Sequence, residues 1–172
     1  MKGRYELTVG GRLGPGRDDD KEATVLNRVI RWTPRGIEYE ADPRQAEKLL
    51  DEMELAGDGV KGVVTPGVKT TPAQIANECE PPNSLHTTFR ALAARANYLA
   101  LDRPDIAFAA KECCRRMSDP TQADFNKLKR LARYLAAHPR LVYNYPWTQE
   151  QPHIVVHTDS DYAGCKRTRK ST

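Results

Sequence analysis

Residues 84–138 decide the fold, and they read SLHTTFRALAARANYLALDRPDIAFAAKECCRRMSDPTQADFNKLKRLARYLAAH. Apolar residues recur here in three successive segments, at the i, i+3, i+4, i+7 spacing of one helix face. The predicted buried stripes are Phe89, Leu92, Ala93, Ala96, Leu99 and Ala100, then Ile106, Ala110, Cys113, Cys114 and Met117, then Phe125, Leu128, Leu131, Ala132 and Leu135. Because the joints between the segments are very short, the three helices are expected to pack as antiparallel neighbours.

The N-terminal side is predicted to be β-structure followed by one helix. The segments TVLNRVIRW and GIEYEA flank a Thr-Pro-Arg-Gly turn at 33–36, which indicates a hairpin. Asp42 precedes the predicted helix, Pro43 occupies its first turn, and Gln45 stands where a capping box needs it. Its buried stripe is expected at Ala46, Leu49, Leu50 and Met53, and Gly57 is its predicted end.

Four regions follow from this pattern, and together they predict an α+β fold. Residues 1–56 form the first region, and residues 57–83, rich in Gly, Pro, Thr and Val, are expected to be an extended linker. Residues 84–140 are the three-helix antiparallel unit. In residues 141–172 two apolar bursts, LVYNY and HIVVHT, predict a C-terminal β-hairpin that opens a truncated domain.

Composition points to an intracellular protein, cytoplasmic or nuclear, with no membrane partner. The 172 residues are 29% charged with a mean hydropathy of −0.69, and no stretch approaches the roughly 20 apolar residues of a membrane span. The N-terminus is charged from its second residue and has no apolar signal core. The four cysteines form no Cys-x-x-Cys pattern, so reduced thiols are expected and a zinc site is not.

Positive charge is concentrated in the second half of the chain. Residues 1–80 carry 12 Lys/Arg against 15 Asp/Glu, whereas residues 81–172 carry 15 against 8. Thr121, with Asp124 three residues on, is predicted to cap the last of the three helices. On this helix Lys127, Lys129, Arg130 and Arg133 lie opposite the core stripe. They are candidates for contacting the phosphates of a nucleic acid. The alternative is a non-catalytic helical interaction or scaffold module whose basic face is merely solvated.

One acidic residue is placed where a divalent metal could bind. Asp159 follows the apolar segment HIVVHT, and Asp161 lies two residues further on. A strand can fix such a carboxylate while its exposed end admits substrate and water. An Asx-turn or a solvated loop end explains the same two residues, so the pattern alone leaves the site open.

Ordered motifs in 84–172 resemble Ty1/copia-type retrotransposon Pol polyproteins, in the segment that follows the reverse-transcriptase palm. That family shows Leu-x-Tyr-Leu, Arg-Pro-Asp-Ile, Met-Ser-x-Pro-Thr and Lys-Arg-x-x-Arg-Tyr-Leu in this order. The matching residues here are 97–99, 103–106, 117–121 and 129–135. The sequences at 158–164 and 169–172 are similar to the family's Ser-Asp-x-Asp-Trp-Ala-Gly and Arg-(Arg/Lys)-Ser-Thr, with Tyr162 in place of the Trp.

The resemblance implies a fragment that runs from the end of the palm through thumb or connection helices into the start of ribonuclease H. It implies that Asp159 is the first metal-binding carboxylate of ribonuclease H, with Mg²⁺ as cofactor only if that site is completed. The implied partners are an RNA–DNA hybrid or a DNA duplex and the rest of the Pol polyprotein. The polymerase's Tyr-x-Asp-Asp is absent and no acidic residue follows Asp161. The chain as given is therefore expected to be catalytically incomplete.

Overall fold

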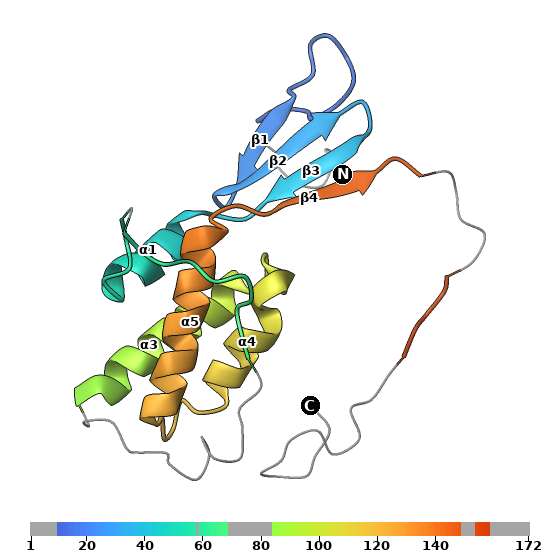
Figure 1. The fold of residues 1–172 in the computed structure, drawn as a ribbon. Helices are drawn as coiled ribbons and strands as arrows, with labels where there is room; N and C mark the ends of the chain where they lie inside the picture. The colour runs from blue at the N-terminus through green and yellow to red at the C-terminus, as the bar shows by residue number, and fades with distance from the viewer. Residues whose placement is uncertain (1–9, 58, 69–83, 149–153, 159–172) are drawn as a thin grey trace, which may run out of the picture.

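The computed structural model describes residues 10–57, 59–68, 84–148 and 154–158. A four-stranded antiparallel sheet stands at one end of a group of four helices (Figure 1). The strands are β1 (Glu22–Val25), β2 (Arg28–Thr33), β3 (Gly36–Glu40) and β4 (Val142–Pro146), and the helices are α1 (Arg44–Glu52), α3 (Ser84–Leu99), α4 (Pro104–Cys114) and α5 (Gln122–Ala137). The predicted α+β class is confirmed.

The predicted hairpin is present, and a further turn lies inside its first segment. β2 and β3 pair with Thr33 opposite Gly36, and the Thr33 hydroxyl accepts a bond from the Gly36 amide at 3.1 Å. TVLNRVIRW is not one strand, because Leu26 and Asn27 have positive φ angles of 52° and 63°. Such angles are typical of a type I′ turn, so β1 folds back onto β2.

The predicted C-terminal hairpin is wrong, because β4 pairs elsewhere. This strand pairs with β3, in a register that sets Tyr143 opposite Tyr39 and Tyr145 opposite Ile37, and residues 154–158 form no strand. The physical reason is side-chain packing across the strands: the Tyr39 and Tyr143 rings lie 6.5 Å apart and continue one apolar face of the sheet. The partner of β4 is therefore about a hundred residues away in the sequence rather than adjacent to it.

The three-helix unit is confirmed, and one core joins it to α1. The predicted stripe residues are buried, except that Ala100, Cys114, Met117 and Phe125 are half-buried at its margin. The Phe89 and Phe125 rings lie 5.1 Å apart between α3 and α5. Leu49 of α1 is fully buried in the same core. Among the helices described here, none is long and apolar enough to cross a membrane.

The start of α1 differs from the predicted capping box. Pro43 is the N-cap residue and no side chain caps the helix. Asp42 instead accepts a bond from the Arg44 amide at 3.1 Å. Gln45 does not reach back to the helix start, because its side-chain oxygen accepts a bond of 3.4 Å from Arg95 of α3. A contact between helices has thus replaced a local cap.

The end of α1 comes earlier than Gly57, the predicted terminator. The helix ends at Glu52, and Glu54 adopts the left-handed conformation with φ 55°. The Leu55 amide then donates to the Leu50 carbonyl at 2.8 Å. This backbone bond satisfies a carbonyl at the helix end without a glycine.

The sheet is joined to the helices through Asp102, in the turn between α3 and α4. Its carboxylate accepts bonds from the Tyr39 hydroxyl of β3 and from Arg28 of β2 at 2.8 Å. Burial and the bond to Asp102 raise the pKa of Tyr39 to about 12. Two strands and one interhelical turn are therefore held at a single carboxylate.

Candidate nucleic-acid interface

The predicted nucleic-acid-binding residues all lie on α5, whose start is fixed by a capping box. The Thr121 hydroxyl accepts from the Asp124 amide, and the Asp124 carboxylate accepts from the Thr121 amide, as the sequence predicts. Leu128 and Leu131 on the opposite face are fully buried. These contacts fix the rotation of α5 about its own axis, so its basic side chains lie on the half that faces away from the core.

Lys127 differs from its neighbours because it is paired with a buried carboxylate. Its ammonium lies 2.9 Å from Asp124, which is fully buried and also accepts from Arg116 at 3.1 Å. Burial alone would raise the pKa of Asp124, but the bonds from Lys127 and Thr121 outweigh it and hold that pKa below its ordinary value. Lys127 is thus already engaged in an ion pair within the protein.

Arg130 and Arg133 contact the segment 59–68, which crosses the outer face of α5 (Figure 1). Arg130 donates to the Thr65 carbonyl at 3.1 Å and to the Thr65 hydroxyl at 2.8 Å. Arg133 donates to the Lys61 carbonyl at 2.6 Å. This part of the predicted linker forms no helix or strand, and it lies against α5.

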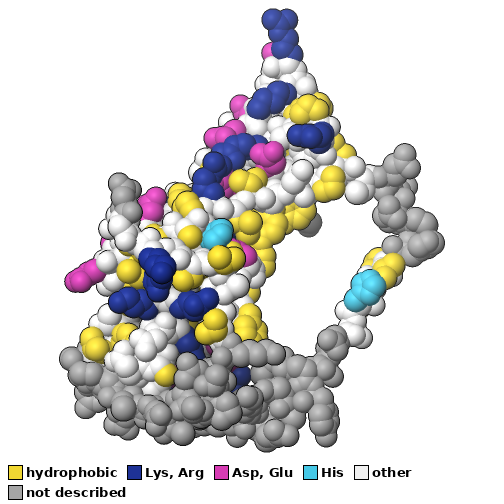
Figure 2. Space-filling model, viewed as in Figure 1, with side chains coloured by type: hydrophobic (Ala, Val, Ile, Leu, Met, Phe, Trp, Pro, Cys, Tyr) yellow, Lys and Arg dark blue, Asp and Glu magenta, His cyan; other side chains and the backbone are white. Residues whose placement is uncertain are grey.

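The outer face of α5 keeps its positive charge despite these contacts. The acceptors that Arg130 and Arg133 find are neutral oxygens, and Lys129 is exposed with no ion pair to any residue that the structure describes. Figure 2 shows Lys and Arg side chains gathered where the 59–68 segment crosses α5. We call Lys129, Arg130 and Arg133 the α5 basic face.

The Arg-Pro-Asp motif at 103–105 has a structural role that sequence reasoning missed. The Arg103 side chain, 2% exposed, binds Asp105 at 2.7 Å and donates to the His138 carbonyl at the end of α5 at 3.0 Å. The Tyr134 hydroxyl donates to Asp105 at 3.0 Å. Burial would raise the pKa of Asp105, but the bonds from Arg103 and Tyr134 hold it below its ordinary value. The motif therefore joins the start of α4 to the end of α5.

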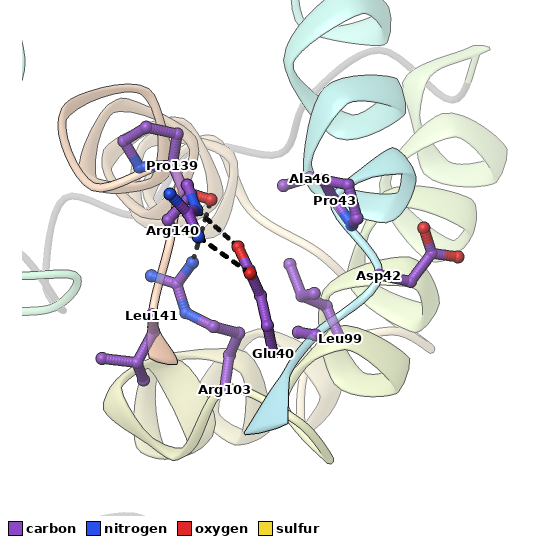
Figure 3. Close-up of a pocket in the computed structure, with 10 residues that line it drawn as sticks. Glu40, Asp42, Pro43, Ala46, Leu99, Arg103, Pro139, Arg140 and Leu141 are labelled. Atoms are coloured by element: carbon purple, nitrogen blue, oxygen red, sulfur yellow. Dashed lines mark hydrogen bonds and ion pairs between the residues drawn. The ribbon is translucent and has the colours of Figure 1, made fainter. Parts of the chain in front are cut away.

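A pocket lies beside this motif, between the sheet and the helices (Figure 3). Its lining residues are Glu40, Ala41, Asp42, Pro43, Ala46, Leu99, Arg103, Pro139, Arg140 and Leu141. Its volume of about 10 Å³ is room for roughly one water molecule. Arg140 bonds Glu40 across it, with Nη2 and Oε2 2.9 Å apart, and Arg140 with Arg31 lowers the pKa of Glu40 to about 2. The pocket is therefore too small for a substrate, and an ion pair spans it.

The predicted metal ligand Asp159 lies outside the described residues, as does Asp161. Within the part of the chain that the structure does describe, no group of three or more His, Cys, Asp or Glu side chains could hold a metal ion. Mg²⁺ binding at Asp159 and ribonuclease H activity of a larger polyprotein therefore stay predictions based on the resemblance.

Comparison with known proteins finds similarity to a plant mitochondrial protein and to parts of two retrotransposon Pol polyproteins. An uncharacterized mitochondrial protein of Arabidopsis thaliana, AtMg00810, is 40% identical over 149 residues, which are 86% of this chain and 58% of that protein. The retrovirus-related Pol polyprotein from transposon RE2 of Arabidopsis thaliana is 40% identical over 53 residues, 31% of this chain and 4% of the polyprotein. The one from transposon RE1 of the same plant is 33% identical over 88 residues, 50% and 6% respectively.

No family model and no solved structure matches the chain. The chain spans a little over half the length of the mitochondrial relative and a small part of the two polyproteins. It is homologous to a segment of retrotransposon Pol polyproteins, which confirms the resemblance seen in its sequence. The assignment to the Ty1/copia type stays a prediction.

Proposed function

We propose that this segment of a Pol polyprotein binds an RNA–DNA hybrid or a DNA duplex by its phosphates, through the α5 basic face. The observation that carries the proposal is the charge balance of that face. Arg130 and Arg133 are bonded to neutral oxygens, and Lys129 is exposed and unpaired within the described chain. Three positive charges thus remain available on one rigid helix.

Rigidity matters because phosphate binding by ordered side chains costs less conformational entropy than binding by a mobile tail. α5 is held by its capping box and by its fully buried leucines. Backbone phosphates carry no sequence information, so the expected binding is independent of sequence. Its affinity is expected to be roughly micromolar or weaker at physiological salt.

Lys127 is left out of the proposed contact set, although its position on the helix suggested it. Its ammonium neutralises the buried Asp124 carboxylate. Moving it onto a phosphate would weaken that pair at the start of α5, which is an unfavourable exchange. Lys127 therefore serves the helix rather than the ligand in this proposal.

The test is the salt dependence of hybrid binding by the parent and by a triple variant, Lys129→Gln, Arg130→Gln and Arg133→Gln. Each phosphate neutralised on a duplex contributes about 0.9 to the slope of log K against log salt concentration. The triple variant should therefore lower the slope by about 2 to 3.

A control variant removes the same charge elsewhere. Arg17, Arg35 and Lys111 are exposed, and they lie in the N-terminal loop, the β2–β3 turn and α4. Their joint change to Gln should leave the slope near that of the parent. If the two triple variants change the slope equally, or not at all, the basic face is only solvated and a helical interaction or scaffold module explains the unit better.

A further inference from the structure

The segment 59–68, which we call the strap, lies over the α5 basic face (Figure 1). It is anchored by Arg130 to both the carbonyl and the hydroxyl of Thr65, at 3.1 and 2.8 Å. Arg133 anchors it at the Lys61 carbonyl, at 2.6 Å. The strap thus occupies guanidinium groups that the proposed function assigns to phosphates.

The strap approaches α5 closely at one glycine. A Cβ added to Gly62 would lie 2.6 Å from the Ala137 Cβ and 3.8 Å from the Arg133 carbonyl oxygen. Contacts below 3.0 Å do not occur for real Cβ atoms, so this position requires glycine while the strap is docked. Gly59, the first residue of the strap and three positions before Gly62, has nothing within 4 Å of such a Cβ.

The strap is only partly buried. Val64 and Val68 are 84% and 58% exposed, whereas Val60, Val63 and Pro66 are half-buried, and no residue of the strap is fully buried. The guanidinium bonds go to neutral acceptors and are themselves largely exposed. Hydrogen bonds at an exposed site contribute little net stability, and these have a neutral acceptor, whereas a phosphate adds its own negative charge and can accept two parallel bonds from one guanidinium.

We propose that the strap is a displaceable cover that competes with nucleic-acid phosphates for Arg130 and Arg133. The proposal rests on the proposed function, and it adds that binding must undock residues 61–65 from α5. With the strap partly docked, the apparent association constant equals the intrinsic one multiplied by the fraction of molecules in which the strap is undocked. If the strap is docked in nine-tenths of the molecules, its full release raises the affinity about tenfold.

Gly62→Ala tests the proposal without altering any charged residue. The added methyl group cannot fit against Ala137, so the strap should undock, and the variant should bind a short RNA–DNA hybrid several-fold to about tenfold more tightly at low salt. Gly59→Ala is the matched control, because it makes the same substitution in open space. Its affinity should equal that of the parent.

Amide hydrogen exchange over the strap shows whether undocking has occurred. Exchange in residues 60–66 should be faster in Gly62→Ala than in Gly59→Ala, and the hybrid should accelerate it in the parent. Exchange that stays unchanged while the hybrid is bound overturns the strap proposal, as does a Gly62→Ala affinity equal to or below that of the parent. If the strap proposal fails in this way while the Lys129/Arg130/Arg133 triple variant still lowers the salt slope, the proposed function stands without it.

Discussion

Asp124 is the residue on which the start of α5 depends most, and Asp124→Ala is expected to destabilise the protein strongly. The carboxylate is fully buried, and one oxygen or the other accepts from the Thr121 amide and hydroxyl, from Arg116 and from Lys127. Alanine removes all four acceptor contacts at once. It removes the buried acceptor that Lys127, Arg116 and the Thr121 amide share.

The size of the effect follows from these contacts. Losing a helix N-terminal capping interaction costs about 1 kcal/mol. Breaking a buried ion pair by removing one partner costs about 3–5 kcal/mol, but Lys127 and Arg116 are 29% and 19% exposed and can regain water in part. We therefore expect a total loss of about 3 kcal/mol, which lowers Tm by about 6–12 °C in a chain of this length.

The assay is urea and thermal unfolding at neutral pH, followed by circular dichroism of the helices. Asp119→Ala is the control, because Asp119 is 67% exposed and lies 3.9 Å from the same Arg116. It should change the free energy of unfolding by less than about 0.5 kcal/mol. A loss below about 1 kcal/mol for Asp124→Ala, or equal losses in the two variants, would refute the role given to the buried carboxylate.

Two further stability predictions follow from the core and from the pocket. Leu128→Asp should unfold the helical unit, because burying an unpaired carboxylate costs several kcal/mol. Asn126→Asp, on the exposed side of α5, should leave Tm nearly unchanged. Equal Tm values for the two variants would show that the buried stripe of α5 is misassigned. Glu40 has its pKa lowered from 4.5 to about 2 by Arg140 and Arg31, so its stabilising effect is present above pH 4.5 and is lost as pH falls toward 2. Glu40→Gln should therefore reduce the acid-induced loss of stability by about 2 kcal/mol, and parallel stability curves for parent and variant between pH 5 and 2 would contradict this.

The parts of the fold that sequence predicted well are those with local causes. The helical stripes of α3 to α5 repeat within a few residues, and the capping box at Thr121 needs a partner only three positions away. The hairpin at Thr33 to Gly36 is likewise specified by its own turn residues. Each of these features can be inferred without knowing what else is nearby.

The features that sequence missed depend on distant partners. β4 pairs with a strand about a hundred residues earlier, and its alternating apolar pattern does not identify that partner. The Gln45 side chain accepts a bond from Arg95 of another helix instead of capping its own. The strap has no helical or strand period, so nothing in its composition indicates that Arg130 would bind Thr65. The same holds for the candidate site. The spacing of the basic residues predicted that they share one helix, but it could not show which of them already bind other parts of the protein.

The central claim is that the α5 basic face binds phosphates, and the salt dependence of the unaltered protein tests it most directly. Binding to a short RNA–DNA hybrid should be measured over a series of salt concentrations at constant pH. Three phosphate contacts by Lys129, Arg130 and Arg133 predict a slope of log K against log salt concentration of about −2.7. A slope near zero, or no binding at low salt, would contradict the claim.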